Sequence, residues 1–176
     1  MKKKNNKDLY FILLRYLSCL FVSFNGLFIF YFIFTPLTLY SVYFLIKIFY
    51  PTAIIQNTQI IFNNSNIKLI GACIAGSAYF LLYILNFTTP MNLKKRVLSL
   101  LYSFFLFFII NVLRIFIFSI LFTNNFSLFN ILHMVIWYGL SGIIVFIVWI
   151  LTIKKFKVKN IPVYTDIKKL ITNLKL

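Results

Sequence analysis

The sequence predicts an all-α fold, a polytopic bundle of transmembrane helices. Three observations support this prediction. Hydrophobic residues make up 62% of the 176 residues and charged residues only 11%, which is more apolar surface than a soluble domain of this size can bury. Long apolar runs recur along the chain, and a span needs about 20 such residues. Most of the 18 lysines and arginines flank these runs rather than interrupt them, as membrane topology signals do.

Four apolar runs are the predicted spans. They cover residues 9–34, 70–87, 97–122 and 131–153. Each is expected to be a helix, because lipid-exposed backbone must satisfy its own hydrogen bonds. The first run follows a lysine cluster, as a secretory signal would. It is too long for a signal and no small-residue cleavage site follows it, so we expect it to remain as a membrane anchor.

The region between the first two spans has a different pattern. Residues 37–50, LTLYSVYFLIKIFY, lie between Pro36 and Pro51 and are short for a span. We interpret them as an interfacial or re-entrant helix on the outer side. The following TQIIFNNSNIKLI contains two β-leaning pieces around Asn63-Asn64-Ser65-Asn66, which predicts a small outer hairpin.

The positive charges predict the orientation. Lysines precede the first run, Lys94, Lys95 and Arg96 follow the second, and a lysine-rich segment follows the fourth. Positive residues favour the cytoplasmic side, so both termini are expected in the cytoplasm of a cell-membrane protein. Residues 1–160 form one integral membrane domain, and residues 161–176 form a short cytoplasmic basic tail.

Composition excludes several kinds of chemistry. Glutamate is absent, and Asp8 and Asp166 are the only acidic residues, so paired-carboxylate mechanisms are not available. One histidine and two cysteines do not suggest a metal cage, and no cofactor is implied. The net charge of +16 is placed beside spans rather than on a soluble domain, so we expect contact with the lipid bilayer and not with nucleic acid.

Arg114 stands out because it lies inside the third run, FFLFFIINVLRIFIFSILF. An ionisable residue within a span is costly and often marks a functional site. Two reactive side chains are expected at the same outer depth. Cys73 opens the second run and His133 enters the fourth, so the three could converge on one pocket that faces outward. Asn111, one helical turn before Arg114, could orient its guanidinium.

These three side chains suit acyl transfer from a peptide bond. A cysteine thiolate is a nucleophile, a nearby cation favours it, and an imidazole can take its proton. Histidine can then protonate the leaving amine. Arginine can hold the peptide carbonyl or stabilise its oxyanion.

At these residues the chain resembles the archaeosortase/exosortase family of multi-pass membrane proteins. Cys73 lies in ACIAG, Arg114 in NVLRI and His133 in ILHMV, and the resemblance covers about residues 30–155. The family cysteine is typically followed by Ser or Thr and then Gly. Here Ile74 and Ala75 follow, and Gly76 comes one place late.

The resemblance implies a cysteine transpeptidase, analogous to sortases but unrelated in fold. It implies as substrates exported proteins that end in a recognition motif, a hydrophobic helix and a basic tail. Such an enzyme would hold the substrate as a thioester on Cys73 and pass it to an amine, expected to be a lipid. The residues alone do not distinguish transpeptidation from hydrolysis.

Two other readings compete with this one. Gly139-Leu140-Ser141-Gly142 matches the GxSG of rhomboid serine proteases, but His133 lies eight residues away on the same predicted helix, roughly 12 Å along its axis. The second is a small transporter or structural membrane subunit, in which Arg114 binds an anion and His133 relays protons. That function would not need a reactive thiol.

Overall fold

The computed structural model describes residues 2–24, 27–136, 139 and 141–174, and it is mostly helical. The helices are α1 (Lys2–Phe24), α2 (Phe28–Phe49), α3 (Gly71–Ile74), α4 (Gly76–Phe87), α5 (Leu93–Thr123), α6 (Phe129–Val135), α7 (Ser141–Lys155) and α8 (Tyr164–Leu174). Three short strands, β1 (Ile54–Gln56), β2 (Gln59–Phe62) and β3 (Ser65–Lys68), lie between α2 and α3.

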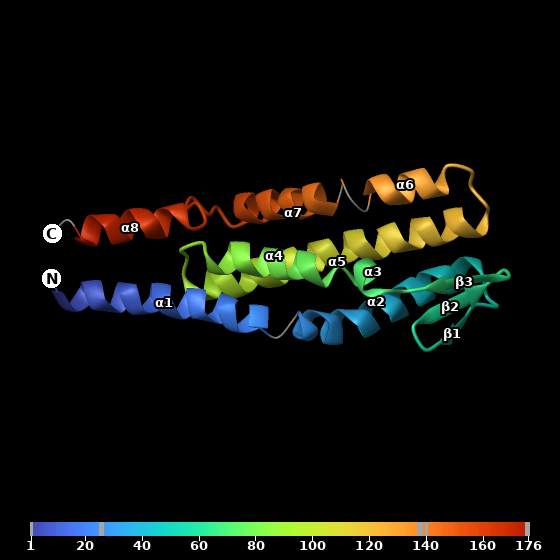
Figure 1. Cartoon of the computed structure of the whole chain (residues 1–176), viewed down its shortest axis with the longest axis horizontal. Coiled ribbons are helices and arrows are strands. Elements are labelled where there is room, and N and C mark those ends of the chain that lie inside the picture. Colours follow the sequence, from blue (N-terminus) through green and yellow to red (C-terminus); the bar gives the residue numbers. More distant parts are fainter. Residues whose placement is uncertain (1, 25–26, 137–138, 140, 175–176) are drawn as a thin grey trace.

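The chain runs back and forth along the length of the molecule (Figure 1). Helices α1 and α2 run from the N-terminal end to the sheet, α3 and α4 return, and α5 runs out again along the middle. Helices α6 and α7 return beside α5, and α8 ends next to the start of α1. Both termini therefore lie at one end and the sheet at the other (Figure 1).

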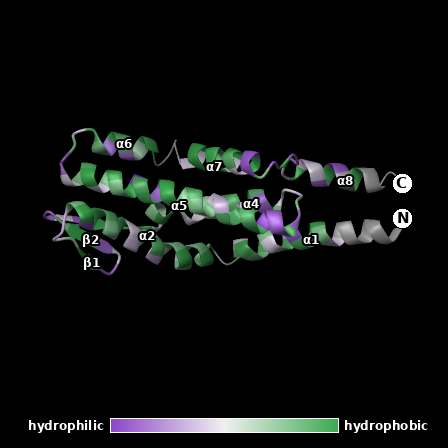
Figure 2. Cartoon of the chain, turned by 180° about the vertical axis from the view of Figure 1, so that it is seen from behind, coloured by the Kyte–Doolittle hydropathy of each residue, from purple (hydrophilic) through white to green (hydrophobic). Residues whose placement is uncertain are grey.

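Helix α5 shows most clearly that large apolar side chains face outward from the bundle. Its buried face carries small and polar residues, among them Ser99, Ser103, Asn111 and Ser119. Its opposite face exposes large apolar side chains, with Leu101 and Phe105 each 61% exposed. A soluble helix has the reverse arrangement. Figure 2 shows that hydrophobic residues cover the middle of the molecule.

Within the described part of the chain, two helices, α2 and α5, are long and apolar enough to cross a membrane. The residues 10–24 of α1 and the region of α3 and α4 are apolar but shorter. The prediction of a mostly helical protein with long apolar helices is confirmed at that level. The four predicted runs, however, are not four uninterrupted helices.

The boundaries predicted around the first run are wrong. Helix α1 ends at Phe24 and α2 begins at Phe28, with Leu27 in a left-handed conformation (φ 63°); residues 25 and 26 lie outside the described part of the chain. Residues 37–50 are not a separate interfacial helix, because α2 continues through Pro36 to Phe49. Proline removes one helical hydrogen bond without stopping an apolar helix that its neighbours support.

The second run is also divided. Ala75, with φ 58°, separates α3 from α4. The fourth run comprises α6 and α7. The prediction that it is one continuous helix falls partly on residues 137, 138 and 140, which the structure does not describe. The third run is confirmed as the single helix α5.

The predicted hairpin is confirmed and extended. Strands β2 and β3 pair antiparallel around Asn63 and Asn64, and β1 adds a third strand on the other side of β2. Both asparagines have positive φ (45° and 58°), as a two-residue hairpin turn of type I′ requires.

The basic tail is more than an extension. Most of it forms α8, and the buried Asp166 forms an ion pair with Arg15 of α1. Another predicted topology charge, Arg96, is also buried. It donates hydrogen bonds to the carbonyl oxygens of Asn86, Phe87 and Thr89 (2.7–3.0 Å), so it caps the C-terminal end of α4.

Candidate active site

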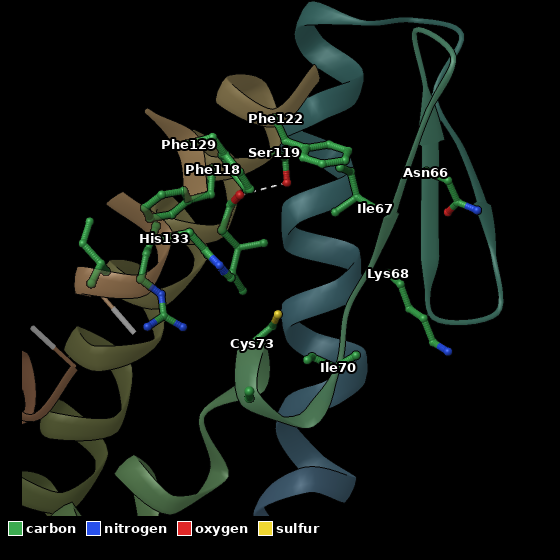
Figure 3. A pocket seen from close by; sticks show the side chains of 14 residues that line it. Asn66, Ile67, Lys68, Ile70, Cys73, Phe118, Ser119, Phe122, Phe129 and His133 are labelled. Atoms are coloured by element: carbon green, nitrogen blue, oxygen red, sulfur yellow. Dashed lines mark hydrogen bonds between the residues drawn. The ribbon is translucent and has the colours of Figure 1, made fainter. Parts of the chain in front are cut away.

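The three predicted site residues line one pocket at the sheet end of the bundle. The pocket has a volume of about 260 Å³, and Cys73 of α3, Arg114 of α5 and His133 of α6 all contribute to its wall. The remaining wall is mostly apolar, with side chains such as Ile115, Phe118 and Phe122. Figure 3 shows the Cys73 sulfur directed into this space and His133 on the side opposite β3. None of the described residues that line the pocket is acidic.

Cys73 is held on a one-turn helix that differs from the start of a continuous span. The turn ends at Ala75, whose left-handed backbone (φ 58°, ψ 43°) redirects the chain into α4. The ring of Tyr31 from α2 lies against this break: a Cβ added to Gly76 would lie 2.8 Å from Tyr31 Cζ. The small residues near Cys73 therefore admit an aromatic ring rather than a neighbouring helix backbone.

Asn111 connects the cysteine turn to α5. Its Nδ2 donates a hydrogen bond of 3.0 Å to the backbone carbonyl oxygen of Cys73. Asn111 is only 2% exposed, so this bond fixes the α3 turn against the helix that carries Arg114. The sequence suggests that Asn111 orients the Arg114 guanidinium. The hydrogen bond in the structure goes to the Cys73 carbonyl oxygen instead.

Arg114 lies between two cavities. Besides the Cys73 pocket, it lines a second cavity of about 360 Å³ between α4, α5 and α7, together with Asn111, Ser77 and Ser141. Ala72 also lines both cavities. The guanidinium is a permanent cation with several donors, and it is placed where a carbonyl oxygen or an anion in either space could meet it.

His133 is supported by aromatic rings. Its ring stacks on Phe129 (centroids 5.5 Å apart, interplanar angle 8°) and meets the edge of Phe118 (5.5 Å, 72°). These contacts restrict the orientation of the imidazole while leaving part of it exposed. A histidine so placed can exchange protons with a group in the pocket.

The geometry disfavours the serine-protease alternative. Ser141 begins α7 and lines the second cavity, whereas His133 lies on α6 and lines the first. Ser141 and His133 thus do not line the same cavity. Two contacts of the site have no signal in the sequence, because each joins residues that are far apart in the chain. They are the hydrogen bond from Asn111 to the Cys73 carbonyl oxygen and the packing of the Tyr31 ring against Gly76.

Comparison with known proteins identifies no relative. No protein-family model matches this chain, and neither a curated protein nor a solved structure matches it. Function therefore has to be argued from the site itself.

Proposed function

We propose that this chain is a membrane-embedded cysteine acyltransferase that cleaves a peptide bond of an exported protein through a thioester on Cys73. One observation carries the proposal: Cys73, Arg114 and His133, far apart in sequence and on three different elements, line a single pocket. The resemblance of ACIAG, NVLRI and ILHMV to the archaeosortase/exosortase motifs points to the same residues.

The reaction assigns one role to each side chain. His133 accepts the proton of the Cys73 thiol, and the sulfur attacks the carbonyl carbon of the peptide bond. Arg114 stabilises the oxyanion that forms. The C–N bond then breaks, His133 returns the proton to the leaving amine, and a thioester remains. An amine, or water, attacks the thioester and restores the free thiol, which yields transpeptidation or hydrolysis respectively.

The proposed substrates are exported proteins with a C-terminal motif, a hydrophobic helix and a basic tail, and the proposed amine acceptor is a lipid. These assignments rest on the family resemblance. Exposed apolar side chains cover the outward faces of α2 and α5. These apolar surroundings of the site support a substrate that arrives from the membrane.

The proposed orientation places both termini in the cytoplasm and the pocket on the outer surface. Helix α5 has 31 residues, about 46 Å, which exceeds a hydrocarbon core of roughly 30 Å. With Lys94 at the inner surface, about 20 residues of helix reach the outer edge of that core near Arg114. The arginine is then an interfacial residue rather than a charge at mid-membrane.

The first experiment is thiol labelling of Cys73 in intact cells, in a Cys19→Ala background, with a membrane-impermeant maleimide. We expect fast labelling from outside at pH 6.5, where an unactivated thiol is almost entirely protonated. Arg114→Ala and His133→Ala should each slow it at least about tenfold, because each removes a group that favours the thiolate.

Two controls separate activation from access. Lys159→Cys, in a background lacking both native cysteines, should label only after the cells are permeabilised. Ser103→Ala, whose hydroxyl donates to the Leu100 carbonyl oxygen of its own helix (2.9 Å), should leave Cys73 labelling unchanged. Slow labelling that ignores pH, Arg114 and His133 would show that Cys73 is a packing residue, and the acyl-transfer proposal would be discarded.

A second candidate function is anion or proton transport through a small membrane carrier. The favouring observation is that Arg114 and Ala72 line both cavities, so an anion could pass from one to the other. Cys73→Ala distinguishes the two functions: it should abolish acyl transfer but leave transport intact.

A further inference from the structure

Strand β3 lies at the edge of the sheet and runs directly into the cysteine turn. The strand order is β1-β2-β3, so one edge of β3 has no strand beside it. Asn66, Ile67 and Lys68 of this strand all line the Cys73 pocket. Only Leu69 and Ile70 separate the end of β3 from α3.

The register identifies which main-chain groups face the free edge. Phe62 and Ser65 flank the two-residue turn and form its hydrogen-bonded pair. Along an antiparallel strand such pairs alternate with unbonded ones. The Leu69 N–H donates to the Thr58 carbonyl oxygen (2.9 Å). This bond confirms that the main-chain N–H and C=O groups of the odd-numbered residues in this segment point to β2. The N–H and C=O groups of Asn66 and Lys68 therefore point away from β2.

The side-chain directions lead to the same two residues. In Figure 3 the Ile67 side chain points toward the pocket, whereas the side chains of Asn66 and Lys68 point away from it. Asn66 and Lys68 nevertheless line the pocket, so their main chain lies beside it. Within the described residues, no hydrogen bond occupies these main-chain groups.

We propose that the free edge of β3 is the substrate-docking edge, and that an extended polypeptide segment pairs with it as a fourth strand. Such a segment would form up to four main-chain hydrogen bonds with Asn66 and Lys68. It would lie along the pocket wall that leads to Cys73. The inference rests on the proposed function, since the paired segment is the stretch that acyl transfer would cleave.

The chemistry of the pocket favours a polypeptide over other occupants. A row of alternating donors and acceptors matches a peptide main chain, whereas a lipid chain has no groups to pair with it. Arg114 and His133 face the same space without any acidic neighbour among the described lining residues. Peptide carbonyls and an acidic side chain are therefore the complementary groups.

The test uses disulfide capture on Cys73, which requires access to the thiol but no acyl transfer. The protein is the Cys19→Ala chain in nanodiscs. The probe is acetyl-Thr-Val-Glu-Val-Thr with a C-terminal 2-mercaptoethylamide, supplied as its mixed disulfide with 2-mercaptoethanol. Two further probes carry N-methyl groups, one on the two valines and the other on the glutamate and the last threonine.

Strand pairing has an alternating signature. Only every second amide of a paired peptide faces β3. The probe that is N-methylated on those amides should therefore lose about tenfold in the capture equilibrium. The other should stay within about threefold of the parent. Equal capture of all three probes, or an equal loss for both methylated ones, would overturn the proposal, and so would a Cys73 that no probe reaches.

Substitutions in the sheet assign the effect to β3. Lys68→Pro removes an edge N–H and no ladder bond, which edge strands tolerate. Its ring occupies the place of the edge amide hydrogen and blocks a paired strand, so it should abolish the difference between the methylated probes. Lys68→Ala keeps the N–H and should preserve the difference. Ile55→Pro is the matched control, because the Ile55 main chain faces the opposite free edge of the sheet. If Ile55→Pro abolished the difference as well, the effect would be loss of the sheet and the docking edge would be discarded.

The outcomes also separate this proposal from the proposed function. If capture alternates between the methylated probes but Cys73 labelling does not change in Arg114→Ala and His133→Ala, the docking edge is kept and acyl transfer is discarded. If Cys73 labelling depends on Arg114 and His133 but capture does not alternate, acyl transfer is kept and the docking edge is discarded.

Discussion

At the scale of single residues, the candidate site depends on contacts that span the chain. Asn111 reaches the Cys73 carbonyl across 38 positions of sequence, and His133 is held between Phe118 and Phe129. Arg114 could be singled out from the sequence, because a charge inside an apolar run is unusual. The bond from Asn111 to Cys73 could not, because no local pattern relates an amide to a distant carbonyl oxygen.

The Asn111 bond leads to a prediction. Asn111→Leu keeps the approximate volume but leaves the Cys73 carbonyl oxygen without its donor. We expect a loss of about 1–3 kcal/mol in the free energy of unfolding, measured by denaturation in mixed micelles, together with slower maleimide labelling of Cys73. Ser103→Ala on the same buried face of α5 is the control and should cost less than about 1 kcal/mol. Unchanged stability and labelling would contradict a positioning role for Asn111.

At the scale of elements, the break between α3 and α4 shapes the site. Ala75 occupies a left-handed conformation, which an L-residue other than glycine adopts at a cost of about 1–2 kcal/mol. The sequence pattern predicts one apolar helix through this position, since alanine favours helix. Packing of the α3 turn against Asn111 and Tyr31 accounts for the break.

Ala75→Gly should therefore stabilise the protein. Relief of backbone strain exceeds the extra entropy that glycine gives the unfolded chain, and we expect a net gain of about 0.5–1 kcal/mol in unfolding free energy. Ala78→Gly, within α4, is the matched control and should destabilise by up to about 1 kcal/mol. A loss of stability at both positions would mean that the left-handed turn carries no strain.

At the scale of the whole molecule, the ends of the chain are joined. The tail helix α8 packs beside α1 through the ion pair of Arg15 with Asp166, and the Val163 N–H donates to the Thr88 carbonyl oxygen (3.2 Å). Asp166 is only 2% exposed and Arg15 14%. The tail thus lies beside α1 at the end of the molecule opposite the pocket (Figure 1).

Asp166→Asn should loosen this end. It removes a charge-assisted hydrogen bond, and we expect a loss of about 1.5–3 kcal/mol in the free energy of docking α8. The measurement is limited trypsin digestion, in which cleavage at the exposed Lys157 and Lys159 should become faster. Because an apolar pair avoids an unpaired charge, Arg15→Leu with Asp166→Leu should recover protection. Equal digestion of all three proteins would rule out a holding role for the ion pair.

The sequence by itself determined the features that depend on composition and on neighbouring residues. These are the apolar helices, the uninterrupted α5, the hairpin around residues 63–66, and the three residue types of the candidate site. Hydrophobicity and local hydrogen bonding act over a few residues, so a pattern can reveal them.

Only the tertiary structure decided the continuity of α2 through Pro36, the turn at Ala75, the burial of Arg96, the ion pair of Arg15, and the convergence of Cys73, Arg114 and His133 on one pocket. Each of these depends on a partner far away in the chain. Arg15 illustrates the reason. In the sequence it is a charge inside the first apolar run, whereas in the structure it forms an ion pair with Asp166, which lies 151 residues later.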